Sequence, residues 1–130
     1  MSNVPVIGTY VSEDNNFTFK ISSADSSNGA IRGTYIASYS PVGQLTVEGT
    51  IASFAWVFNK GQGKDGVAPF TVAFGGSVRP EPGRAYCIND AWSAVYLPDN
   101  TILAEGSRSF VNQDGVAEVR SLGTKRFAIR

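Results

Sequence analysis

The chain of 130 residues contains no histidine and only one cysteine, Cys87. A single cysteine cannot form an internal disulfide, and without histidine it cannot supply the ligands of a usual zinc site. The lack of histidine also excludes the Ser-His and Cys-His pairs that activate the nucleophile in many hydrolases. We therefore expect a protein that is not an enzyme and that carries no cofactor and no metal.

An excess of charge of either sign and a long apolar run are both absent. Eleven basic residues balance eleven acidic ones, whereas proteins that bind nucleic acids or acidic membranes carry net positive charge. No apolar run approaches the roughly 20 residues of a membrane helix. The opening "MSNVPVIGTY" lacks the basic segment and apolar stretch of a secretory signal. We expect no nucleic-acid or membrane partner, and a cytoplasmic location or secretion with the signal peptide absent from this sequence.

Helix signals are scarce, because only four leucines occur and no window shows a 3.6-residue apolar period. Short runs rich in Val, Ile, Thr, Phe and Tyr alternate instead with Gly, Asn, Asp and Pro clusters, a pattern typical of strands and turns. The pattern predicts eight strands, at Ile7–Ser12, Phe17–Ser22, Ala30–Tyr39, Gln44–Phe58, Val67–Val78, Ala85–Leu97, Thr101–Val111 and Val116–Ile129.

The links between these strands are short and carry turn residues. Asn28-Gly29 and Asp114-Gly115 suit the positive φ of tight hairpins, and Pro98 begins a further turn. Short links predict an antiparallel meander, and eight such strands can close into an up-and-down barrel with room for one small ligand. We therefore expect one all-β domain over residues 1–130, with bends where Gly33 and Gly49 interrupt strands.

The stretch "GAIRGTYIAS" at residues 29–38 resembles the avidin and streptavidin family, in which the tyrosine of a Gly-Thr-Tyr strand binds the ureido oxygen of biotin. The opening "GTYV" is similar to the family's Gly-x-Trp start. The segments "GTIAS", "APFTVAF", "DAWSAVYL" and "GTKRFAIR" follow in the order of the family's fourth, fifth, sixth and eighth strands. The resemblance implies an avidin-like barrel over nearly the whole chain, a small-molecule ligand such as biotin, and assembly as a dimer or tetramer.

The resemblance also implies a set of ligand-binding residues: Ser12, Asn16, Tyr35, Phe74 and Trp92. The first three would supply directional hydrogen bonds, and the two aromatic residues would form an apolar wall. Phe70 replaces Phe74 in this set if the register of that strand is shifted. An alternative interpretation of Tyr35 is a core residue whose hydroxyl bonds another side chain.

Several positions depart from the family's pattern. Ala37 stands at its serine or threonine of the third strand, and Arg108 stands near its tryptophan of the seventh. Ala117 lies near the tryptophan that one subunit lends its neighbour, and Lys125 lies near the aspartate of the last strand. A buried group that loses a hydrogen-bond partner costs about 1–3 kcal/mol. The resemblance thus implies a binding barrel whose biotin affinity is weakened or lost.

A second interpretation is a lectin-like or inhibitor-like interaction module that binds through loops 59–66 and 79–84 of the barrel rim. Residues 61–66, "GQGKDG", match the spacing of a dinucleotide-binding loop, but the run that follows contains Pro69 and reads as a strand rather than the required helix. Prolines stiffen loop 79–84, which favours the presentation of side chains to a partner. Asp90 and Glu105 are a further candidate pair of carboxylates on adjacent strands.

Overall fold

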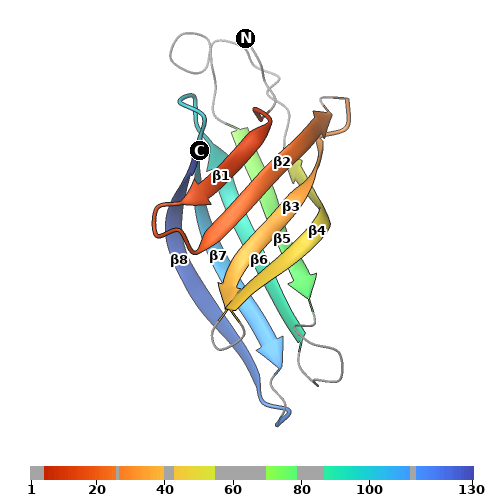
Figure 1. Ribbon diagram of the computed structural model, residues 1–130, viewed down its shortest axis with the longest axis vertical. Helices are drawn as coiled ribbons and strands as arrows, with labels where there is room; N and C mark the ends of the chain where they lie inside the picture. The colour runs from red at the N-terminus through yellow and green to blue at the C-terminus, as the bar shows by residue number, and fades with distance from the viewer. Residues whose placement is uncertain (1–4, 26, 40–42, 55–69, 79–86, 112–113) are drawn as a thin grey trace.

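The computed structural model describes residues 5–25, 27–39, 43–54, 70–78, 87–111 and 114–130. The regular elements of the described residues are all strands, joined by turns and arranged as a barrel (Figure 1). The strands are β1 (Gly8–Ser12), β2 (Phe17–Asp25), β3 (Ala30–Tyr39), β4 (Gly43–Phe54), β5 (Phe70–Val78), β6 (Cys87–Tyr96), β7 (Thr101–Val111) and β8 (Ala117–Ile129). No helix in these ranges is long and apolar enough to cross a membrane.

Each strand pairs antiparallel with the next, and β8 pairs with β1 to close the barrel. The prediction of an all-β antiparallel barrel is therefore confirmed. The observed bounds of β3 and β7 equal the predicted ones, while β2 runs on to Asp25. The predicted strand residues 55–58, 67–69 and 85–86 lie outside the described part of the chain.

Alternation along the strands sets which side chains fill the barrel. In β2 the buried residues are Phe17, Phe19 and Ile21, and in β7 the buried positions likewise occur at every second residue. Inward aromatic rings stack across the interior: Phe19 lies parallel to Phe74 at 4.4 Å between ring centroids, and Phe127 meets Phe74 edge-on at 5.4 Å. The middle of the barrel is thus a packed aromatic core.

Gly33 allows β2 and β3 to approach closely. A Cβ atom at this position would lie 1.8 Å from the backbone oxygen of Lys20, a distance that no side chain can tolerate. The register between β3 and β4 also shifts next to Gly33, so that Gly33 pairs with Thr50 but Tyr35 pairs with Val47. This shift spans Gly49, and the predicted irregularities at both glycines are confirmed.

The barrel has two distinct ends. At the upper end of Figure 1, β1 begins, β8 ends, and the turns at Gly29 and Asn100 join their strands. At the lower end lies the β7–β8 turn, which contains Gly115, whereas the turn after the short strand β1 lies about halfway down the barrel. Gly29, Asn100 and Gly115 have φ of 74°, 64° and 79°, as their turns require. These ends differ in the polar groups that they enclose.

Candidate functional site

At the upper end, two tyrosines form a neutral hydrogen-bonded cluster, here called the upper cluster: Tyr10, Tyr96, Val6 and Asn100. The Tyr10 hydroxyl donates to the Val6 carbonyl at 2.6 Å and lies 2.7 Å from the Tyr96 hydroxyl. The Val6 amide donates to Tyr96 at 3.1 Å, and Asn100 Oδ1 lies 3.2 Å from the same hydroxyl. Burial, together with the neighbouring Tyr96, raises the pKa of Tyr10. The groups that satisfy these two tyrosine hydroxyls are therefore uncharged.

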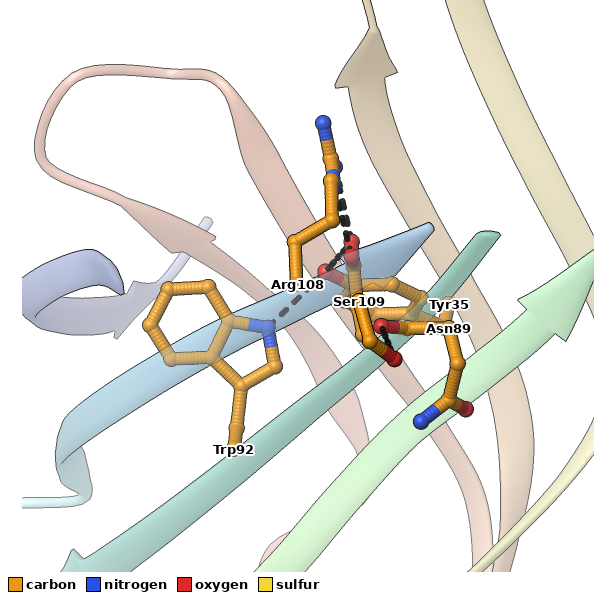
Figure 2. A network of polar contacts seen from close by, with 6 residues as sticks. Tyr35, Asn89, Trp92, Arg108 and Ser109 are labelled. Atoms are coloured by element: carbon orange, nitrogen blue, oxygen red, sulfur yellow. Dashed lines mark hydrogen bonds and ion pairs between the residues drawn. The ribbon is translucent and has the colours of Figure 1, made fainter. Parts of the chain in front are cut away.

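Toward the lower end, a second cluster contains a buried ion pair. We call it the Asp90 network, and its members are Tyr35, Asp90, Trp92 and Arg108. Trp92 Nε1 donates to the Tyr35 hydroxyl at 2.8 Å, and that hydroxyl donates to Asp90 Oδ2 at 2.8 Å (Figure 2). Arg108 donates to both carboxylate oxygens, from Nε at 2.6 Å and from Nη2 at 2.8 Å. The side chains of Asp90 and Arg108 are only 3% and 10% exposed.

The strand register brings this network together. Asp90 on β6 lies directly opposite Arg108 on β7, and Trp92 lies opposite Gly106. A Cβ atom on Gly106 would lie 2.6 Å from the indole of Trp92. The missing side chain at Gly106 therefore leaves room for the indole, whose Nε1 reaches across the interior to Tyr35 on β3.

The Asp90 network is internally satisfied. Burial, and then the negative charge of Asp90, raise the pKa of Tyr35, so that its hydroxyl remains a hydrogen-bond donor. The two-pronged contact of Arg108 compensates the buried carboxylate. In the described part of the chain, every buried side-chain nitrogen and oxygen has a hydrogen-bond partner. A molecule that entered here would therefore have to replace existing bonds rather than supply missing ones.

The predicted ligand-binding residues occupy three different surroundings. Tyr35, Phe74 and Trp92 lie together in the interior, with ring centroids of Phe74 6.3 Å from Tyr35 and 6.0 Å from Trp92. Ser12 is fully buried, but its hydroxyl donates to Asp14 Oδ1 at 2.6 Å and accepts the Phe17 amide at 3.0 Å. It thereby holds the β1–β2 turn.

Asn16 lies in that turn and is exposed, and its backbone amide donates to Asp14 at 3.0 Å. Lys125 Nζ contacts the other carboxylate oxygen of Asp14 at 2.8 Å. Although partial burial opposes its ionisation, hydrogen bonds from Lys125, Ser12 and the Asn16 amide lower the pKa of Asp14 to about 2. A charge pair thus links the β1–β2 turn to β8.

The partnership of Asp90 with Arg108 was missed by the sequence analysis, although a signal for it exists. Asp90 precedes Asp99 by as many positions as Arg108 follows it, and Asp99 lies in the turn that joins β6 to β7. A hairpin centred on this turn places the two residues opposite each other. Both also share the inward alternation of Trp92. The suggested carboxylate pair of Asp90 and Glu105 is wrong, because Glu105 is exposed on the outer face and lies opposite Ser93.

The outer face of β6, β7 and β8 carries a shallow groove of about 510 Å³. Small or polar side chains line it: Ala91, Ser93, Glu105, Ser107, Val119 and Ser121. Loops 59–66 and 79–84, and the side chains of Phe70 and Cys87, lie outside what the structure describes. Among the described residues, no group of three or more His, Cys, Asp or Glu side chains could hold a metal ion.

Comparisons of the sequence with protein-family models and with curated proteins find no match.

Proposed function

We propose that this chain is a non-catalytic binding barrel of the avidin type, which takes a small ligand at its lower end. The supporting observation is the Asp90 network, where hydrogen-bonding groups and aromatic walls converge inside one half of the barrel. This combination is typical of small-molecule sites, in which a few polar groups orient a ligand against apolar surface. The buried hydrogen bonds described at the upper end join the uncharged groups of the upper cluster.

Biotin is one candidate ligand of this site, with an affinity well below that typical of the family. Its ureido oxygen would need the Tyr35 hydroxyl, whose single proton is donated to Asp90. A hydrogen bond to a charged group contributes about 1.5–3 kcal/mol. Each 1.4 kcal/mol of lost binding free energy raises the dissociation constant about tenfold. The contacts of Tyr35 alone therefore favour weak binding or none.

The indole proton of Trp92 is the most direct reporter for a test, because it donates to Tyr35 within the site. A titration of ¹⁵N-labelled protein would follow this resonance, assigned with the Trp92→Phe variant. We expect a saturable shift only at high biotin concentration. Stoichiometric binding at micromolar concentration would contradict the weakened affinity.

The same resonance also tests interior binding in general. Biotin-sized ureas, amidines and carboxylic acids should be titrated one by one beside biotin. Failure of every compound to produce a saturable shift would contradict a ligand site inside the barrel. A Tyr35→Phe variant that folds but shows no shift of the Trp92 resonance would mean that the Tyr35 hydroxyl contacts the ligand rather than only packing in the core.

Assembly of the chain into a homo-oligomer is favoured by exposed apolar side chains beside the outer groove. Val119, Leu103 and Val95 are 77%, 39% and 36% exposed on adjacent strands β8, β7 and β6. We propose that this face binds a second copy of the chain in a dimer or tetramer. Light scattering coupled to size-exclusion chromatography should give more than one subunit for the native chain and a smaller assembly for Val119→Lys. A monomeric native chain would contradict this assignment.

A further inference from the structure

We propose that the interior site is a receptor for a planar guanidinium or amidinium group, and that Arg108 is its built-in occupant. The inference deepens the proposed function and rests on it, since it concerns the same end of the barrel. Its basis is the geometry of the ion pair: two donors of one guanidinium face the two oxygens of one carboxylate at 2.6 and 2.8 Å. A planar fork of this kind recognises the shape of its partner as well as its charge.

The receptor groups are held in place without Arg108. Asp90 accepts the Tyr35 hydroxyl at 2.8 Å, and Trp92 fixes that hydroxyl from its far side at 2.8 Å. These three side chains come from β3 and β6, whereas the occupant comes from β7 (Figure 2). Removal of the Arg108 side chain therefore leaves an oriented carboxylate with space in front of it. Such preorganisation lowers the entropy cost of binding.

The chemistry of the site sets its selectivity. A buried carboxylate repels anions and requires a compensating positive charge. Methylurea has nearly the shape of methylguanidinium, but it is neutral and leaves the carboxylate charge uncompensated. Methylammonium brings the charge but lacks the planar fork that matches both oxygens. We therefore expect the order methylguanidinium, then methylammonium, then methylurea.

In the native chain, Arg108 occupies this site. Arg108 is attached to the strand next to Asp90, so its effective concentration at the carboxylate far exceeds that of a dilute external ligand. A free guanidinium compound must displace it and should bind the native protein weakly. A neutral ureido ligand must compete with the same occupant, which agrees with the weak binding proposed for the native chain.

Calorimetry on the Arg108→Ala variant tests the proposal, with methylguanidinium, methylammonium and methylurea at low millimolar concentration. Saturable binding of methylguanidinium, at least tenfold tighter than that of methylurea, is expected. The native chain should not show saturable binding of methylguanidinium at these concentrations. Arg120→Ala is the matched control, because Arg120 is an exposed arginine of β8 that pairs with Glu118. The double variant Arg108→Ala/Asp90→Asn should lose the binding.

A folded Arg108→Ala variant that binds no methylguanidinium, or binds methylurea as well, would overturn the proposal. If the variant does not fold alone, its refolding yield should rise more with methylguanidinium than with methylammonium, and least with methylurea. Equal yields with the two cations would also overturn it. These outcomes are separate from those of the proposed function, which is tested by ligand binding to the native chain.

Discussion

The two ends of the barrel both bury tyrosine hydroxyls, yet they satisfy them with different groups. In the upper cluster, Tyr10 and Tyr96 bond each other and the backbone of Val6. In the Asp90 network, Tyr35 bonds an indole and a carboxylate, and the carboxylate requires a guanidinium. The upper cluster is uncharged, and the Asp90 network contains two buried charges.

The difference matters because the two kinds of burial have different costs. Removing one neutral hydrogen-bond partner near the surface allows water to replace it at small cost. Removing one member of a buried ion pair leaves the other charge without compensation, which is far more destabilising. Stability alone does not require a buried ion pair, since apolar side chains often serve as well. Replacing both charges together should therefore cost far less than removing one of them.

The largest effect should follow Arg108→Met, which keeps an unbranched side chain but removes the charge. Leaving Asp90 unpaired should lower the free energy of unfolding by about 3–5 kcal/mol, measured by urea titration. The double variant Asp90→Asn/Arg108→Met should recover more than half of this loss, because neither charge remains. A double variant as unstable as the single one would show that charge compensation is not the cause.

A smaller loss is expected for Tyr35→Phe. The change removes the hydroxyl that donates to Asp90 and accepts from Trp92, leaving two buried polar groups short of a partner. The free energy of unfolding should fall by roughly 1.5–3 kcal/mol in the same urea titration. A change below about 0.5 kcal/mol would mean that water replaces the hydroxyl, and that the network is wetter than its burial indicates.

The equivalent change at the upper end, Tyr10→Phe, should cost about 1 kcal/mol, because the lost partners are neutral. The Val6 carbonyl is only partly buried, so water can reach it. Urea titrations of Tyr10→Phe and Tyr35→Phe side by side compare the two ends directly. Equal losses of unfolding free energy would mean that the uncharged upper cluster and the charged Asp90 network do not differ in this respect.

The barrel itself could be predicted from the sequence because its determinants are local. Alternation in Phe17–Ile21 assigns the inward face, and the turn residues at Gly29 and Gly115 mark where strands reverse. Gly33 and Gly49 predict irregularities: the backbone of Lys20 leaves no room for a side chain at Gly33, and the register of β3 and β4 shifts across Gly49. Each of these signals depends on residues within a few positions of one another.

The site was harder to predict because its contacts join distant segments. The partner of Tyr35 is 55 residues away along the chain, and β3 faces β6 only after the barrel closes. Whether Ser12 points its hydroxyl at a ligand or at Asp14 depends on the rotamer and on the shape of the β1–β2 turn. Residue type restricts these choices without selecting among them.

The smallest predicted effect concerns acid and the ion pair between the β1–β2 turn and β8. The pKa of Asp14 is lowered to about 2 in the folded chain, below the 3.8 of an ordinary aspartate. Its pairing with Lys125 therefore stabilises the fold above about pH 4 and is lost as the pH falls toward 2. The side chains of Lys125 and Asp14 are 25% and 29% exposed, so solvent screening limits the contribution to about 0.5–1 kcal/mol.

Urea titrations at pH 5 and pH 2.5 should show this loss in the native chain and a smaller one in Lys125→Met. Other carboxylates titrate in the same range, so the difference between the two chains is the quantity to compare. One molar salt should reduce that difference, since it screens partly exposed charges. Tyr10→Phe should leave the acid dependence unchanged, because the upper cluster contains no group that titrates in acid. An equal acid sensitivity of Lys125→Met and the native chain would mean that the Asp14–Lys125 pair does not help to close β1 against β8.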